Sequence, residues 1–327
     1  FFINGRRYEQ SISNRKLKWK LKNLEDTVLI KNFKRTITSW KTSTFEIYKL
    51  AFEKYGGSVN MHPDVVSFFM KNHAWKIDFF HYEKNGDIKG AYFRCNGTQV
   101  GIMARRRYPL SSDEILIPFD SHTKCFFPDK TNKLSMINKP NIINATWSIA
   151  RKKQNCIIKE EFSTKFEKTR RNEVQRFIRN GGEIKCIEEL SDSEIARLYI
   201  SLFQSRFGNM LPCYKYDDLL RFVSYLRKMI FGYVLFWNNK PCAIDIVLKS
   251  ESSCNVYYDV PNGAILNDDD CMKLSPGSVL MWSNINRARK YCHENNKKMI
   301  YSIGAFRPEW KYKLLWSAPF KLGKCLC

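Results

Sequence analysis

Residues 231–248 have the sequence FGYVLFW-NNKP-CAIDIVL, which predicts a strand, a turn and a second strand. Phe231–Trp237 and Cys242–Leu248 are apolar runs of the length that buried strands take, and Asn238–Pro241 has the composition of a turn. Two segments with helical periodicity precede this unit, Ser191–Phe207 and Tyr216–Met229. The local order is therefore helix, helix, strand, turn, strand.

The same order of elements occurs earlier in the chain. Thr44–Tyr55 and Val65–His73 have helical patterns, and Trp75–Tyr82 and Ile88–Cys95 read as strands on either side of an Asn85-Gly86 hairpin turn. The order repeats after about 150 residues, close to half of the 327-residue chain. We therefore predict an α+β protein of two similar halves, with mixed, mostly antiparallel sheets flanked by helices.

Two further helices and a basic segment complete the predicted organisation. Thr164–Asn180 is the clearest helix, and Gly181 follows it as a stop signal. A second helix runs from Ser275, the expected N-cap, to about Asn295, and Lys298–Ile303 follows as a strand. The predicted basic arm, first half and second half span 1–41, 42–160 and 161–327.

The net charge of +23, from 55 Lys and Arg against 32 Asp and Glu, predicts an anionic partner. The charge is concentrated in residues 1–41, with a net +8, and in 151–185, with a net +6. Within the arm, Arg15–Lys22 alternates basic and apolar residues around Trp19, as in a solvated edge strand or a segment that binds membrane or nucleic acid. The partners considered are an anionic membrane surface, tRNA and DNA.

Several classes of protein are disfavoured by the sequence. No apolar run approaches the roughly 18–20 residues of a membrane-spanning helix, and no signal peptide is evident. The 11 cysteines include no C-x-x-C pair, and the five histidines form no H-x-x-x-H or H-E-x-x-H motif. We therefore expect no metal site, and free thiols in a reducing cytoplasm.

The order strand, antiparallel strand, small-residue turn, helix, strand resembles one half of a GNAT-type acyltransferase. The chain is similar to the Fem-like branch, which carries two such halves. Three segments carry the resemblance: the basic helix Lys168–Gly182, the helix start Ser275–Leu280, and the strand Tyr301–Gly304 with the following Trp310–Trp316. The resemblance implies transfer of an acyl or aminoacyl group to an amine, with acyl-coenzyme A or aminoacyl-tRNA as donor.

The resemblance also implies a site for the donor. A donor phosphate would lie at the helix start, where free N–H groups attract anions. Because Pro276 lacks an N–H and the second glycine of the usual coenzyme A loop is missing, an aminoacyl-tRNA held by the basic helix is the better match. A solvated helix face is the alternative. The expected donor-binding residues are Ser275, Gly277, Ser278, Gly304, Lys311 and Lys313, and the expected anion-binding residues are Lys168, Arg170, Arg171 and Arg179.

Acyl transfer to an amine needs a base for the amine and an acid for the leaving group. Asp245 interrupts an apolar strand, and Tyr258-Asp259 ends the next one. Tyr312 lies between two lysines in the last segment of the resemblance. We take Asp245, Tyr258, Asp259 and Tyr312 as the candidate catalytic residues.

Tyr55–Val66, with the sequence YGGSVNMHPDVV, resembles the signature of the Mig family. The namesake of that family is a macrophage-inducible antimicrobial-peptide-resistance protein of enteric bacteria. The resemblance implies a role in surviving cationic peptides and peripheral association with the cytoplasmic face of the inner membrane. Because the chain is itself cationic, direct capture of those peptides is disfavoured.

A second resemblance suggests a different function. Leu202–Gly208, followed by Pro212 and Tyr214, is similar to the end of the second helix in an AraC-type DNA-binding domain. The alternatives to a transferase are therefore a DNA-binding transcriptional regulator and a non-catalytic GNAT scaffold that docks on the membrane.

Overall fold

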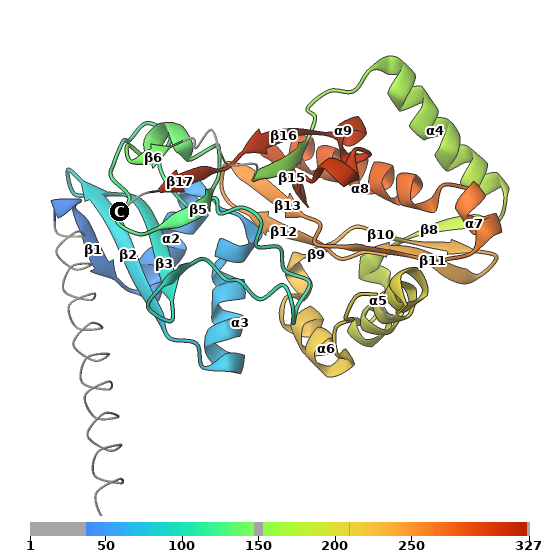
Figure 1. Ribbon diagram of the computed structural model, residues 1–327, viewed down its shortest axis with the longest axis horizontal. Helices are drawn as coiled ribbons and strands as arrows, with labels where there is room; N and C mark the ends of the chain where they lie inside the picture. The colour runs from blue at the N-terminus through green and yellow to red at the C-terminus, as the bar shows by residue number, and fades with distance from the viewer. Residues whose placement is uncertain (1–36, 147–152, 209, 326–327) are drawn as a thin grey trace, which may run out of the picture.

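The computed structural model describes residues 37–146, 153–208 and 210–325 (Figure 1). Most of the basic arm predicted for 1–41 therefore lies outside the described residues. The described part forms four sheets. No helix within it is long and apolar enough to cross a membrane. Its cysteines are free thiols, most of them buried.

The first half is built on an antiparallel sheet of order β1-β2-β3-β4 that packs against α2. The predicted hairpin is confirmed, because Lys84 pairs with Asp87 and leaves Asn85 and Gly86 as a two-residue turn. Both turn residues have positive φ, 55° and 80°, as a tight hairpin requires. Its elements are β1 (Trp40–Ser43), α2 (Phe45–Tyr55), α3 (Pro63–His73), β2 (Ile77–Lys84), β3 (Asp87–Cys95), β4 (Gln99–Val100), β5 (Thr131–Leu134), β6 (Ala145–Thr146) and β7 (Gln154–Ile158).

The second half contains a sheet of order β16-β7-β15-β13-β12-β9 and another of order β14-β11-β10-β8. Helices α5 and α8 contact the latter sheet and lie on opposite sides of it (Figure 1). The helices of this half are α4 (Thr164–Arg179), α5 (Asp192–Phe207), α6 (Tyr216–Tyr225), α7 (Asp269–Lys273), α8 (Pro276–Glu294) and α9 (Lys313–Trp316). Its strands are β8 (Gly182–Cys186), β9 (Ile230–Phe231), β10 (Tyr233–Trp237), β11 (Lys240–Asp245), β12 (Val247–Glu251), β13 (Asn255–Asp259), β14 (Gly263–Ile265), β15 (Lys298–Ala305), β16 (Ser317–Lys321) and β17 (Gly323–Cys325).

The hairpin predicted from residues 231–248 is confirmed, but each of its strands is broken. Trp237 pairs with Lys240, so Asn238 and Asn239 form the turn. The outgoing strand divides into β9 and β10 at Gly232, and the returning strand divides into β11 and β12 at Ile246. β9 and β12 belong to the six-stranded sheet, whereas β10 and β11 belong to the four-stranded sheet. The two sheets therefore separate at the breaks in these strands.

The halves exchange strands. β7, from the range expected to form the first half, lies between β16 and β15 in the six-stranded sheet. β17, from the end of the second half, lies between β5 and β6 in a small sheet of the first half. The register pairs Phe320 with Asn155 and Lys324 with Thr146. Each half thus contains a strand from the sequence of the other.

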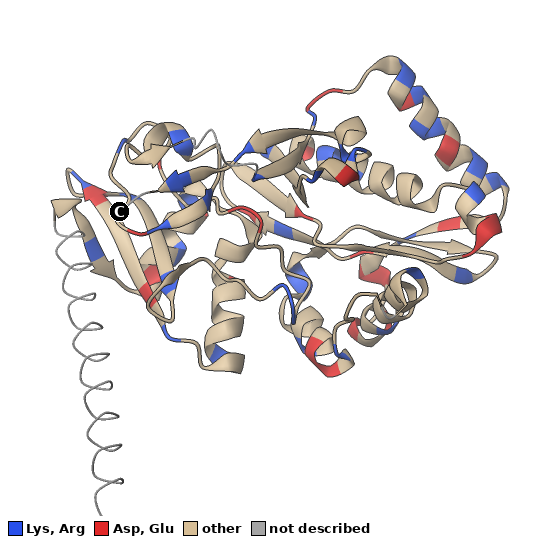
Figure 2. Ribbon diagram, in the orientation of Figure 1, with Lys and Arg blue, Asp and Glu red and all other residues tan. Residues whose placement is uncertain are grey.

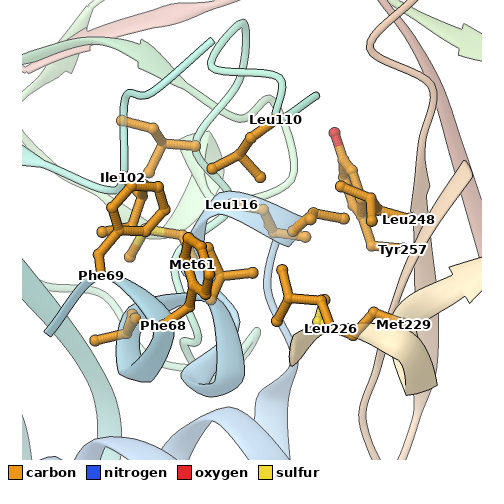
Figure 3. Packing of buried hydrophobic residues seen from close by; sticks show 14 of the residues in the cluster. Met61, Phe68, Phe69, Ile102, Leu110, Leu116, Leu226, Met229, Leu248 and Tyr257 are labelled. Carbon is orange, nitrogen blue, oxygen red and sulfur yellow. The ribbon is translucent and has the colours of Figure 1, made fainter. Parts of the chain in front are cut away.

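One buried apolar cluster also spans both halves (Figure 3). Met61, Phe68 and Leu116 of the first half are fully or almost fully buried with Leu226 and Met229 of the second. Figure 3 shows these side chains facing one another between the α3 region and the second-half segments. The interface between the halves therefore resembles a domain core.

The segment Tyr55–Val66 forms part of this junction. The Ser58 hydroxyl accepts a hydrogen bond from the Leu116 N–H at 3.0 Å, and Asn60 Nδ2 donates to the Glu114 carbonyl at 3.1 Å. The carbonyl of Gly57 accepts from the Ser250 hydroxyl of β12 at 2.9 Å. These contacts give the segment a structural role at the junction.

Replacing Gly57 with alanine is expected to lower the free energy of unfolding by about 1–3 kcal/mol, as overpacking of a core does. An added Cβ would lie 2.7 Å from a ring carbon of Phe52 and 2.9 Å from the Leu116 carbonyl oxygen. Urea denaturation measures the change. Gly86→Ala is not a neutral control because its φ is positive, so Ser201→Ala at an exposed position of α5 serves instead. An unchanged midpoint for Gly57→Ala would contradict the close approach.

Candidate active site at the break in the sheets

Asp245 ends β11 at the break and is only 6% exposed. Asn284 of α8 donates from Nδ2 to its Oδ2 at 3.4 Å, and the Asn284 Oδ1 accepts from the Tyr233 N–H at 2.9 Å. Burial raises the pKa of Asp245 to about 6, although the Arg206 charge and the Asn284 hydrogen bond act in the opposite direction. This carboxyl group is therefore mostly ionised at pH 7 but binds a proton more readily than an ordinary aspartate.

Gly263 lies opposite Asp245 in the β11–β14 pair. A Cβ at this position would lie 2.4 Å from Asp245 Oδ1, so glycine leaves the space that the carboxylate occupies. Arg206 of α5 donates from Nη1 to the Gly263 carbonyl at 2.7 Å. The arginine of the AraC-like segment is thus part of the surroundings of Asp245, and Phe203 and Tyr214 from the same region are core residues.

Asp259 ends β13 and is 4% exposed. Burial, reinforced by the charges of Asp113 and Glu114, raises its pKa to about 8, while Arg105 and a hydrogen bond with Ser111 oppose the rise. Its Oδ1 is buried and has no hydrogen-bond partner among the described residues. Asp259 is therefore mostly protonated at pH 7 and holds an oxygen without a partner.

Tyr301 of β15 connects the two aspartates electrostatically. Burial and then the charges of Asp245 and Asp259 raise its pKa well above the usual value. Its hydroxyl is buried and, within the described ranges, makes no hydrogen bond. Tyr301 was not among the predicted site residues, because a tyrosine in an apolar strand is indistinguishable from a core residue.

Tyr258 was expected beside Asp259, and the structure places it on the opposite face of β13. Its ring stacks on Tyr301, with centroids 5.5 Å apart, and its hydroxyl lies 3.9 Å from Cys292 Sγ of α8. The neighbouring Tyr257 shares the face of Asp259 and donates from its hydroxyl to Glu114 Oε2 at 2.7 Å. Tyr258 therefore lies on the same face of the sheet as Tyr301 and away from the face of Asp259.

The first half supplies a buried polar network to this region. Glu114 also accepts from Asn155 Nδ2 at 2.7 Å, and Asn155 donates to the Ser302 hydroxyl at 3.1 Å. Asp113 accepts from the Ala305 N–H at 3.0 Å and from Arg105 Nη1 at 3.2 Å. Asp113 and Glu114 carry no sequence motif, because they lie in an irregular loop and their partners in β7, β13 and β15 are far away in the chain.

Gly304, Tyr312 and Lys313 lie next to this region. Gly304 has a φ of 76° and lies against Asp113. Lys313 is buried and donates from Nζ to the carbonyls of Ile303 and Ala305 at 2.6 and 2.8 Å, and burial lowers its pKa. The Tyr312 side chain is 56% exposed. Partial burial and the charge of Asp245 raise its pKa, and the charge of Arg206 lowers that pKa. Lys311 is exposed.

The start of α8 differs from the expected phosphate loop. Ser275 occupies the N-cap position but has left-handed φ and ψ of 57° and 48°, and its side chain does not cap the helix. Its hydroxyl lies 3.4 Å from Arg176 Nη2 of α4. Gly277 lies against Ile265, where a Cβ would be 2.9 Å from Cδ1, and Ser278 is half-buried in the first turn.

Helix α4 carries Lys and Arg along most of its length (Figure 2). Lys168, Arg171 and Arg179 are exposed. Arg170, in contrast to these three, is half-buried. It pairs with Glu173 at 2.9 Å and lies over the Trp316 ring. Three of the four expected anion-binding residues are therefore available to a partner.

The architecture defines this chain as a protein of the tandem GNAT, Fem-like fold. The crystal structure of FemX matches with a TM-score of 0.56 and 7% identity, over 88% of this chain and 97% of that chain, a likeness that shows the fold alone. A family model described as Mig-14 matches residues 62–325, so the chain belongs to the Mig-14 family. The predicted family and α+β fold class are confirmed.

Two other solved structures are similar to the chain. One is the C-terminal domain (DUF2156) of a putative lysylphosphatidylglycerol synthetase from Agrobacterium fabrum, with 9% identity, coverage of 86% and 92%, and a TM-score of 0.47. The other is a tandem GNAT protein from the clavulanic acid biosynthesis pathway, with 8% identity, coverage of 87% and 97%, and a TM-score of 0.37. A comparison with curated proteins gave no match.

Replacing Asp259 with asparagine is expected to stabilise the protein increasingly as the pH rises from about 4 to about 8. A raised carboxyl pKa means that folding favours the protonated form, so the wild type loses stability as pH rises through this window. The gain in the free energy of unfolding should reach roughly 2–4 kcal/mol at pH 7. Denaturation by urea at several pH values measures it.

The control for this prediction is Asp87→Asn, an exposed aspartate at the first position of β3. This variant should show no comparable pH trend. An Asp259→Asn effect that is the same at pH 4.5 and pH 8 would contradict the raised pKa.

Proposed function

We propose that the chain transfers an acyl or aminoacyl group to an amine at the break in the sheets. The observation that carries the proposal is the pair Asp245 and Asp259, two buried carboxyl groups whose pKa values are raised to different extents, to about 6 and about 8. A pair of groups with separated pKa values is typical of acid–base catalysis.

The two carboxyl groups suit different tasks. Asp245, mostly ionised at pH 7, accepts the proton that the amine loses as it attacks the carbonyl carbon of the donor. Asp259, mostly protonated, donates a hydrogen bond to the carbonyl oxygen or a proton to the leaving oxygen. The hydroxyl of Tyr301, which has no partner among the described residues, is a further donor.

The donor that the surface favours is an aminoacyl-tRNA. Lys168, Arg171 and Arg179 of α4 are exposed to a polyanion. At the start of α8, by contrast, Pro276 removes one of the N–H groups that a coenzyme A pyrophosphate would bind, and the second glycine of the usual loop is missing. Membership of the Mig-14 family supports a role in antimicrobial-peptide resistance, at the cytoplasmic side of the inner membrane.

The proposal is tested by incubating the purified chain with charged tRNA or acyl-coenzyme A and inner-membrane extract as the source of amine acceptors. Mass spectrometry of the products detects the transferred group. Transfer from charged tRNA alone is the expected result. Absence of transfer from both donors, with binding to anionic vesicles intact, would favour the non-catalytic scaffold, and a shift of DNA at moderate salt would favour the regulator.

A further inference from the structure

A pocket of about 430 Å³ lies in the first half, and its walls come from the end of α3 and the loop after β4. Its lining includes the rings of Phe69 and Trp75, whose centroids are 4.7 Å apart, and the three consecutive arginines Arg105–Arg107. The pocket therefore combines an aromatic wall with a cationic one. The proposed catalytic aspartates belong to the second half and are not among its lining residues.

The positive charge in the pocket exceeds the negative charge that balances it. Arg107 forms two hydrogen bonds to Asp218 of α6, at 2.9 Å from Nε and 2.7 Å from Nη2. Arg105 pairs with Asp113 at 3.2 Å. Arg106 is exposed and forms no ion pair with any of the described residues. Three guanidinium groups thus face two carboxylates.

The ion pairs leave donors available to a ligand. A guanidinium has five N–H bonds, and Arg107 uses only its Nε and Nη2 on Asp218. The Arg107 side chain is still 53% exposed and that of Arg105 38% exposed. Asp218 therefore fixes the position of Arg107 without neutralising the whole pocket.

We propose that this pocket binds a phosphate group attached to a planar ring. A phosphate carries a charge of about −1.5 to −2 at neutral pH and accepts paired hydrogen bonds from arginine. The neighbouring Trp75 offers the face on which a flat ring can stack. The proposal concerns binding alone and holds whether or not the aspartates at the sheet break are catalytic.

His73 provides an internal reporter for the occupied pocket. Its Nε2 lies 2.6 Å from the Tyr108 hydroxyl, and its Nδ1 lies 3.5 Å from Arg107 Nη1. Burial and the charges of Arg107 and Arg221 lower the pKa of His73, while Asp218 raises it. A bound phosphate adds negative charge beside the ring, so binding should raise this pKa.

The test is calorimetric titration of the whole protein with adenosine monophosphate, inorganic phosphate and adenosine. Adenosine monophosphate should bind most tightly and adenosine most weakly. Arg106→Gln should weaken the binding of adenosine monophosphate about tenfold, as loss of a charge-assisted contact does. Arg197→Gln, on the exposed side of α5, is the matched control and should leave it unchanged.

A second variant separates the ring from the phosphate. Trp75→Ala should weaken the binding of adenosine monophosphate severalfold and leave the binding of inorganic phosphate unchanged. A short oligonucleotide ending in adenosine distinguishes the sources of the ligand: tighter binding than the mononucleotide indicates an RNA end, and weaker binding indicates a free nucleotide.

Two results would overturn the proposal. One is binding of adenosine as tight as that of adenosine monophosphate. The other is equal affinity in Arg106→Gln and wild type, with no rise in the pKa of His73 when its ring resonances are followed by NMR on addition of the nucleotide.

Discussion

Asp245→Asn is expected to reduce kcat/KM for transfer to the amine by about 100-fold or more, the usual effect of removing a positioned general base. The asparagine side chain has the same shape as the aspartate but cannot accept the amine proton. In the wild type, the rate should rise with pH through about 6, where the Asp245 carboxyl loses its proton. The variant should lack this rise. Initial rates between pH 5 and pH 8 measure both effects.

The fold itself should survive this substitution. Burial raises the pKa of Asp245, so a neutral side chain removes an unfavourable buried charge, and the Asn variant should be at least as stable as the wild type near neutral pH. Asp87→Asn, at the exposed start of β3, should keep full activity. If Asp245→Asn retains more than a third of the wild-type rate with an unchanged pH profile, Asp245 is not the base.

Phe68→Ala is expected to lower the free energy of unfolding by about 3–5 kcal/mol, as for large-to-small changes in well-packed cores. Phe68 is fully buried, and its ring lies 5.2 Å from that of Tyr108 and 5.5 Å from that of Phe222. It therefore packs against residues of both halves. Because one core spans them, both halves should unfold in a single shifted transition.

Hydrogen exchange can follow the two halves separately. Amides of the β2–β3 hairpin and of the β10–β11 hairpin should lose protection to the same extent in Phe68→Ala. Phe126→Ala, at a position that is 50% exposed, should change stability by less than about 0.5 kcal/mol. Loss of protection confined to the first half would show that the halves unfold independently.

The parts of the fold predicted from the sequence are those that depend on neighbours in the chain. Both hairpins have turn residues that adopt positive φ, Asn85-Gly86 and Asn238-Asn239, and their strands are short apolar runs. The helix expected at Thr164–Asn180 is found at Thr164–Arg179. Strand exchange by β7 and β17 is different, because no local pattern specifies a partner more than a hundred residues away.

The candidate site was predicted only where a polar residue breaks an apolar pattern. Asp245 and Asp259 stand out at the ends of strands, and they lie close enough for both charges to act on Tyr301. Tyr301 and Glu114 have no such signal: one belongs to an ordinary apolar strand and the other to an irregular loop. Tyr258 differs from Asp259, because alternation along β13 places its side chain on the face of Tyr301 and away from the face of Asp259.

The exchange of β7 and β17 has a consequence for how the protein is made. During synthesis the first half emerges from the ribosome with β5 and β6 already present, but β17, which lies between them, ends at Cys325. Until that strand is translated, the edges of β5 and β6 have no partner and are exposed to other chains. The small sheet of the first half can therefore form only after almost all of the described sequence has been translated. Folding intermediates that lack β17 expose unpaired strand edges and are targets for chaperones.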